Sequence, residues 1–516
     1  LKTASSSRRA DVSTSTSAGV QMAEQRAADD LYRKTLRFLV SVAAELAFPK
    51  CQLRGGHTLG NGFLYELEGG IACEEEVWNI HQKLKELVDS DETIYRVTKP
   101  WKKAMTYFNE HKLTSASALL ASRVKTEVAC YECHGVLRLN LFDLHQKASA
   151  LKAGSFSLIY LKETPGFVVA YADDYQLQSA LLTSHSDHKA FCKGYQVRSV
   201  GELNHLSQVG RGRKDFVLAC EFRQESKIAE IVAKVKERMV EGRQVKVICI
   251  AGPTSSGKTT FATKLCMYLQ NYGFEAKPLT VDHYYLPLPR QPKYQARQQR
   301  SDVDYDHIES MDVELICEHL NALIAGKSVM TPVYNMKTGY RDGDGHKFDA
   351  LPPNGILVIE GIHALNPMYT QAVDVNKVFK IFISPLTALQ LDDHNCVKTT
   401  DHRLLRRMSR DYLFRGNSAA RTLGMWDNVR KGEGVWIFPH QNSADFVMNS
   451  AAEYEIPVLK TFIEPLLRSV PPDDDTYAKA QDVLNLLDSF STWPPELTPG
   501  QALLREFIGD GAFDCH

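Results

Sequence analysis

The segment GPTSSGKT at residues 252–259 constrains the fold of this chain more than any other feature. It fits the pattern G-x-x-x-x-G-K-[ST], a loop whose backbone N–H groups surround the phosphates of a nucleoside triphosphate. In such loops the lysine reaches the β- and γ-phosphates, and the hydroxyl that follows it binds Mg²⁺. The pattern therefore predicts ATP and Mg²⁺ as cofactors and the following contact residues: Gly252, Pro253, Thr254, Ser255, Ser256, Gly257, Lys258, Thr259 and Thr260, with Thr259 on the metal.

The residues on both sides of this loop predict the strand and the helix that it requires. Val245–Ala251 is a short apolar run rich in β-branched residues, which is typical of a buried parallel strand. Lys258–Tyr272 carries apolar residues at helical spacing, and Gly273 is placed to end that helix. A glycine-rich turn without a ligand is the alternative, but the strand, loop and helix together favour a phosphate-binding loop.

Composition limits the class of protein. A length of 516 residues suggests about three domains, and a net charge of −1 provides no overall field that would attract nucleic acid or an anionic membrane. No apolar run approaches the roughly 18 residues of a membrane span. The 11 cysteines are odd in number and widely spaced, so we expect free thiols, a reducing compartment and a cytoplasmic location. Free thiols are also expected at Cys130 and Cys133, although Cys-x₂-Cys-His formally fits a metal or haem site.

The pattern along the chain divides it into five parts. We expect a disordered tail at 1–28, an α+β domain at 29–215, a connector helix at 216–242, an α/β domain with a mostly parallel sheet at 243–470, and an extension at 471–516 that packs on that domain. The native N-terminus, and any targeting signal on it, is left open. Candidate strands of the parallel sheet are Val245–Ala251, Ala276–Val281, Ile356–Glu360 and Val378–Ile383.

Acidic residues follow two of these strands, at the edge where open α/β sheets bind ligands. Asp282 comes directly after the second strand, where a carboxylate could orient a hydroxyl and accept its proton. Glu360 ends the third strand, after four apolar residues, and is a candidate for holding Mg²⁺. The predicted catalytic residues are Asp282 and Lys258, and a helix cap or a buried ion pair is the alternative for Asp282.

Two further groups of residues suit a nucleotide-like ligand. Three acids, Asp302, Asp304 and Asp306, lie beside Tyr305, and Tyr334 follows later in the chain. Acids and aromatic rings together fit a ribose and a base as well as they fit a solvated loop. Arginines then recur on one helix face, where an anion such as a triphosphate would relieve their repulsion. We therefore predict that this face forms a lid, and a solvated basic surface is the alternative. The arginines of this face are Arg403, Arg406, Arg407, Arg410 and Arg415.

Taken in order, the motifs GPTSSGKT, VDHYY, DYDH, TPVYN, VIEGIHALNP and LLRRMSRDYLFRG resemble the uridine kinase branch of the uridine kinase/phosphoribulokinase family. The resemblance covers about residues 243–470. It implies ATP-dependent phosphorylation of a nucleoside 5′-hydroxyl, in nucleoside salvage, with uridine or cytidine as the expected acceptor. By residue, it implies Asp282 as base, Glu360 near Mg²⁺, substrate contacts from Tyr285, Tyr305, Asp306 and Tyr334, and phosphate contacts from Arg407, Arg410 and Arg415.

The chain departs from that family pattern at two positions. Uridine-cytidine kinases carry a base-contacting histidine shortly after the tyrosine that matches Tyr334, and Gly339 stands near that position here. A second lid arginine is replaced by Asn417. The choice of base, or of another small alcohol or sugar phosphate as acceptor, therefore stays open.

The N-terminal half resembles the editing region of threonyl-tRNA synthetase, through the segment HTLGNGFLYELEGG that begins at His57. The family's His-x₃-His pattern ends here in Asn61, and no later Cys-x₃-His follows, so we expect editing activity to be absent. An ATP-switched regulator that binds RNA or tRNA is a further alternative, which the near-zero net charge disfavours. Homo-oligomerisation is left open.

Overall fold

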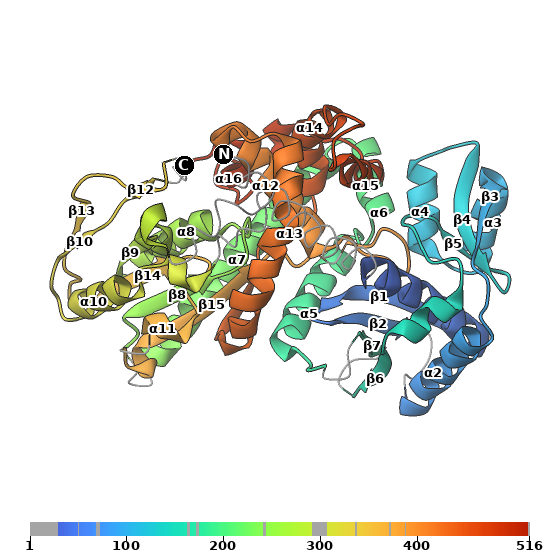
Figure 1. The fold of residues 1–516 in the computed structure, drawn as a ribbon, viewed down its shortest axis with the longest axis horizontal. Helices are drawn as coiled ribbons and strands as arrows, with labels where there is room; N and C mark the ends of the chain where they lie inside the picture. Colours follow the sequence, from blue (N-terminus) through green and yellow to red (C-terminus); the bar gives the residue numbers. More distant parts are fainter. Residues whose placement is uncertain are drawn as a thin grey trace, which may run out of the picture.

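The computed structural model describes residues 29–49, 51–68, 73–162, 166–171, 175–240, 244–291, 307–335, 338–370, 373–387 and 389–513. The expected tail at 1–28 lies outside these residues. Within them, the chain forms an N-terminal α+β half and a C-terminal α/β half, with helices α5 and α7 between the two main sheets (Figure 1).

The N-terminal half is built on a four-stranded antiparallel sheet of order β1-β2-β7-β6. The helix at residues 29–47 contributes Leu39 and Val42 to a buried core that also holds Phe63 and Phe167 of the sheet. β6 and β7 form an antiparallel hairpin, in which Leu161 pairs with Gly166. The bounds are β1 Gln52–Leu59, β2 Gly62–Glu68, α2 Glu74–Asp89, β6 Ser157–Leu161 and β7 Gly166–Ala170.

A smaller three-stranded sheet of order β3-β4-β5 completes this half and lies at its outer end (Figure 1). Two helices pack on it, and α5 and α6 then lead to the long helix α7 that was expected as a connector. The buried residues of α7 include Ile228, Val232 and Val235, which recur at helical spacing and face the core. The bounds are β3 Tyr95–Pro100, α3 Trp101–Glu110, α4 Thr114–Ser122, β4 Glu127–Cys133, β5 Val136–Leu139, α5 Ser179–Gly194, α6 Val200–His205 and α7 Gly212–Val240.

The C-terminal half is built on a five-stranded sheet of order β16-β15-β8-β14-β9, in which every neighbouring pair is parallel. The predicted parallel sheet is therefore confirmed, and the four candidate strands are all present. The short edge strand of this sheet, β16, was not predicted from the sequence. The bounds are β8 Val247–Ala251, α8 Lys258–Asn271, β9 Glu275–Thr280, α10 Val313–Ile324, β14 Gly355–Glu360, α11 Pro367–Thr370, β15 Val378–Ser384 and β16 Phe446–Asn449.

Two short hairpins and a group of helices complete this half. The hairpins pair β10 Val329–Thr331 with β13 His346–Phe348, and β11 Tyr334–Asn335 with β12 Tyr340–Arg341. The C-terminal helices, drawn in orange to red, group together next to this sheet (Figure 1). Their bounds are α12 Thr399–Arg415, α13 Ala419–Trp436, α14 Glu455–Arg468, α15 Tyr477–Leu487 and α16 Arg505–Ile508.

One buried core joins the two halves. It combines Phe108 of α3 and Val217 of α7 with Leu405 of α12, Leu459 of α14 and Trp493 near the C-terminus, all fully buried. Burial of each side chain of this size contributes about 1.5–3 kcal/mol to stability, so the described C-terminal residues 471–513 are an integral part of the fold. None of the helices in the described ranges combines the length and hydropathy of a membrane span.

Candidate active site

The phosphate-binding loop lies between the central strand β8 and helix α8, as the motif predicts. Gly252 is required by a close approach, because a Cβ there would lie 2.0 Å from the carbonyl oxygen of Ile383 in β15. Gly257 has a φ of +86°, which L-residues with side chains rarely adopt. The loop thus packs closely against the neighbouring strand and leads directly into the N-terminus of α8, where anions are favoured.

Lys258 is buried at the first position of α8. Its ammonium donates hydrogen bonds to the carbonyl oxygens of Gly252 and Pro253, at 3.0 and 3.1 Å. Burial lowers the pKa of Lys258, and the negative charges of Glu360 and Asp282 oppose that shift. The lysine is therefore held inside the loop and faces both acids that the sequence singled out.

Glu360 and Asp282 come from the ends of the two strands beside the loop. Glu360, the last residue of β14, is aligned with Ile250 of β8 and with Thr280 of β9, and Asp282 follows Thr280 by two residues. The sheet therefore brings the two acids to the same edge as the loop. A Cβ on Gly361 would lie 2.9 Å from Cβ of Val281, so this glycine lets the end of β14 pack closely against the residue that precedes Asp282.

The surroundings of Glu360 fit a cation. The residue is 3% exposed, and within the described part of the chain its Oε1 has no hydrogen-bond partner. Burial, together with the nearby charge of Asp282, raises the pKa of Glu360 to about 7. A buried carboxylate oxygen without a partner is a ligand that suits Mg²⁺.

Two of the predicted substrate residues lie together. The rings of Tyr285 and Tyr334 are 5.3 Å apart at an angle of 40°. His283 has a structural role, since its Nδ1 accepts a hydrogen bond of 3.3 Å from the N–H of Tyr334. The other two predicted substrate residues, Tyr305 and Asp306, lie outside the described residues.

Gly339 occupies a buried position that has no room for a side chain. Its φ is +75°, and a Cβ there would lie 2.1 Å from Cδ1 of Leu288. Its carbonyl oxygen also accepts a hydrogen bond of 2.9 Å from the N–H of Leu288. A side chain at this position would therefore clash with Leu288 and strain the backbone.

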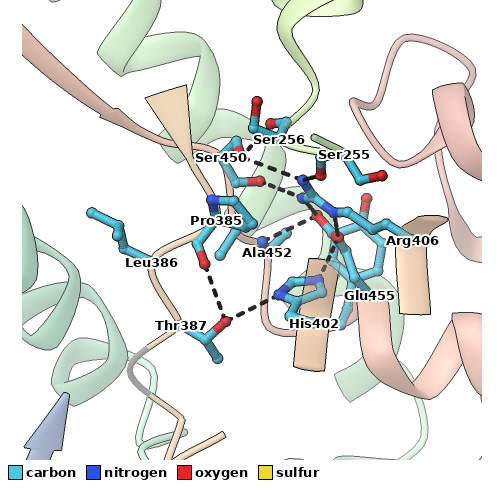
Figure 2. A network of polar contacts seen from close by, with 12 residues as sticks. Ser255, Ser256, Pro385, Leu386, Thr387, His402, Arg406, Ser450, Ala452 and Glu455 are labelled. Atoms are coloured by element: carbon cyan, nitrogen blue, oxygen red, sulfur yellow. Dashed lines mark hydrogen bonds and ion pairs between the residues drawn. The ribbon is translucent and has the colours of Figure 1, made fainter. Parts of the chain in front are cut away.

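The expectation that all five arginines form a lid is wrong for two of them. Arg403 donates two hydrogen bonds of 2.6 Å to Glu433, and Arg406 donates two of 2.7 Å to Glu455. Both guanidinium groups are almost completely buried, at 1% and 0% exposure. Arg406 also donates to the carbonyl oxygen of Ser255, so it supports the phosphate-binding loop from below (Figure 2). Spacing alone could not reveal these partners, which lie in later helices.

The three arginines predicted to contact phosphates lie nearer the loop or solvent. Arg407 and Arg410 donate to the side-chain oxygens of Thr254 and Ser255, at 3.4 and 3.2 Å. Arg415 pairs with Asp411 at 3.1 Å and is 46% exposed. Arg407 and Arg410 are therefore already beside the loop, while Arg415 is further out on the same helix.

Two acids at the loop were missed by the sequence reading. Glu433 of α13 accepts a hydrogen bond of 3.0 Å from the N–H of Thr254. Glu506 of α16 accepts from the N–H and the hydroxyl of Thr260, at 3.3 and 3.0 Å. Neither acid carries a local motif, and both lie far from the loop in sequence, so only the folded chain reveals them.

A buried polar cluster joins the two halves away from this site. His188 and Cys192 of α5 lie beside Glu453, with ligand-type atoms all within 4.8 Å of one another. The side-chain N–H of Asn449 donates to Nδ1 of His188, which leaves the proton on Nε2, facing the Glu453 carboxylate. This arrangement favours a hydrogen-bonded network over a metal centre. Cys130 and Cys133 are buried and form no disulfide within the described residues.

Comparison with known proteins matches the C-terminal half. Residues 247–457 match the model of the "Phosphoribulokinase / Uridine kinase family". A uridine kinase of Halobacterium salinarum is 30% identical over 207 residues, which are 40% of this chain and 80% of that protein. A uridine kinase of Staphylococcus aureus is 28% identical over 224 residues, 43% of this chain and 96% of that protein.

Two solved structures are also similar to part of the chain. One is a putative fructose transport system kinase from Silicibacter sp. TM1040, at 18% identity and a TM-score of 0.32, covering 43% of this chain and 98% of that one. The other is a possible uridine kinase from Bacillus stearothermophilus, at 17% identity and a TM-score of 0.27, covering 40% and 89%.

Proposed function

Since the chain belongs to the phosphoribulokinase/uridine kinase family and is therefore a phosphotransferase, we propose that it transfers the γ-phosphate of ATP to the 5′-hydroxyl of a nucleoside. Uridine and cytidine are the first candidates, because the relatives of highest similarity reported above carry the name uridine kinase. The observation that carries this proposal is the convergence of Lys258, Glu360 and Asp282 at adjacent strand ends of one sheet.

The loop and its lysine bind the triphosphate in this proposal. The N–H groups at the start of α8 and the ammonium of Lys258 hold the β- and γ-phosphates, and Arg407 and Arg410 approach from α12. Thr259 and Glu360 would hold Mg²⁺, which neutralises part of the phosphate charge when it is bound. These groups stabilise a loose transition state chiefly by position and charge.

Asp282 acts on the acceptor. Its carboxylate orients the 5′-hydroxyl and takes its proton as the oxygen bonds to the γ-phosphorus. The bond from that phosphorus to the β–γ bridging oxygen breaks, and ADP leaves with the bridging oxygen. The neighbouring rings of Tyr285 and Tyr334 would pack against the acceptor, a contact that suits a flat base.

The structure around Gly339 favours a second candidate, an acceptor that is not recognised through a histidine at this position. A small alcohol or a sugar phosphate would need no such contact. A panel of nucleosides, sugar phosphates and other small alcohols with γ-labelled ATP separates the two. Labelled nucleoside 5′-monophosphate as the main product supports the proposal, whereas transfer only to other alcohols supports the alternative.

A further inference from the structure

The C-terminal segment at residues 501–508 lies against the phosphate-binding loop, although it is outside the region of the family match, which ends at residue 457. Leu503 is 1% exposed and belongs to the core formed by β8 and α8. The carbonyl oxygen of Gln501 accepts a hydrogen bond of 3.1 Å from Lys264 of α8. The segment is thus packed onto the helix that begins at Lys258.

Within this segment, Glu506 reaches the first turn of α8. One oxygen, Oε2, accepts hydrogen bonds from both the N–H and the hydroxyl of Thr260. Glu506 is 5% exposed, so these bonds are shielded from water. A carboxylate in this place is favoured by the helix dipole. It satisfies an N–H one position beyond Thr259, the last residue of the loop motif.

The other oxygen of Glu506 faces Arg410. Its Oε1 lies 3.3 Å from Nη1 of Arg410, whose Nη2 donates to the hydroxyl of Ser255 in the loop, at 3.2 Å. The ring of Phe507, the next residue, lies 5.5 Å from the Arg410 guanidinium carbon. One acid and one aromatic ring of the same segment therefore fix the direction of this guanidinium.

Arg410 needs such a partner. Burial lowers its pKa to about 10, and the positive charges of Arg415 and Arg407 add to that effect, while Glu506 opposes it. Without Glu506, electrostatic repulsion from Arg407 and Arg415 would favour rotation of the Arg410 side chain away from the loop. The acid both neutralises the guanidinium and aims it at Ser255.

We propose that Glu506 is a positioning residue for phosphoryl transfer, which acts through Arg410 to place a positive charge over the bound triphosphate. The proposal rests on the ATP site of the proposed function. It makes the C-terminal segment part of the nucleotide site, because Glu506 at once caps α8 through Thr260 and holds Arg410 against the loop.

The test compares kcat and KM for ATP in the full-length chain and in Glu506→Gln, Arg410→Gln and the double variant. Loss of one charge-assisted hydrogen bond corresponds to a fall of about 10- to 100-fold in kcat/KM for ATP. Because Glu506 acts through Arg410, the double variant should lose no more than the Arg410 variant alone, within about twofold. Glu506→Asp keeps the charge and should restore part of the loss.

Glu496→Gln is the matched control, since it removes the same charge from an exposed position of the same C-terminal region. It should behave as the wild type. The inference is overturned if Glu506→Gln keeps the wild-type kcat/KM, or if the two losses multiply in the double variant, which would indicate a general structural role. If Glu506→Gln does not fold, the same comparison of single and double variants is made with Glu506→Asp in place of Glu506→Gln. A wild-type chain that binds no ATP by calorimetry instead contradicts the proposed function.

Discussion

Arg403 and Glu433 form a fully buried ion pair whose carboxylate also holds the phosphate-binding loop. Both guanidinium contacts are 2.6 Å, and Oε1 of Glu433 accepts in addition from the N–H of Thr254 at 3.0 Å. Helix α12, helix α13 and the loop thus meet at one carboxylate. The ion pair therefore holds the loop in place and is not part of a lid.

Glu433→Gln should therefore destabilise the protein and weaken ATP binding together. Breaking one side of a buried ion pair costs about 3–5 kcal/mol, because a buried charge is left without its partner. Urea unfolding and calorimetric titration with ATP measure the two effects. Unfolding within about 0.5 kcal/mol of the wild type would show that the pair contributes nothing.

Arg415→Ala should give the opposite pattern. The side chain is 46% exposed and pairs only with Asp411 among the described residues, so its loss should change the unfolding free energy by less than about 1 kcal/mol. If Arg415 closes over the phosphates as the family resemblance implies, kcat/KM for ATP should still fall about tenfold. Equal activity in the variant and the wild type would remove Arg415 from the site.

Gly339→Ala should impair acceptor use and leave ATP binding unchanged. The variant adds a Cβ against Leu288 and places alanine at a φ of +75°. Gly343→Ala is the matched control, with a φ of +56° and nothing within 4 Å of its Cβ, so it carries only the backbone cost of about 1 kcal/mol. A higher KM for the acceptor in the first variant alone supports the placement of the acceptor pocket; equal values in both variants contradict it.

Glu221 makes stability depend on pH. Burial raises its pKa from 4.5 to about 7, and Tyr454 donates it a hydrogen bond of 2.7 Å. Between these two values the native state keeps a proton that the unfolded chain has lost, so this contribution to stability falls as the pH rises to about 7 and is then constant. Glu221→Gln should be more stable than the wild type at pH 8, by on the order of 1–3 kcal/mol, and similar at pH 5. Urea unfolding at both pH values checks this, and parallel pH profiles would contradict it.

The sequence predicted the parts of the fold that local pattern determines. The strand before Gly252, the helix after it and the acids at 282 and 360 depend on short motifs and on strand ends, and the parallel sheet brings them together as expected. The edge strand Phe446–Asn449 was missed because four residues give no clear alternation. Its place in the sheet comes from pairing with β15.

Ion pairs between residues far apart in the chain could not be predicted from the sequence in the same way. The arginine face of α12 looks uniform in sequence, yet Arg403 and Arg406 are buried against acids, while Arg410 and Arg415 are not paired with those acids. The partner Glu506 lies 96 residues from Arg410. Helical spacing shows which residues share a face but not which later helix covers it, so buried pairs and phosphate ligands cannot be told apart.

Asp282 gives the most direct test of the account as a whole. On whichever acceptor the wild-type chain phosphorylates fastest, Asp282→Asn keeps the size of the side chain and removes the base. The account predicts a fall in kcat of about 10²- to 10⁴-fold, with KM for ATP unchanged within about threefold. A kcat within about threefold of the wild type would contradict the assignment of this strand end as the catalytic site.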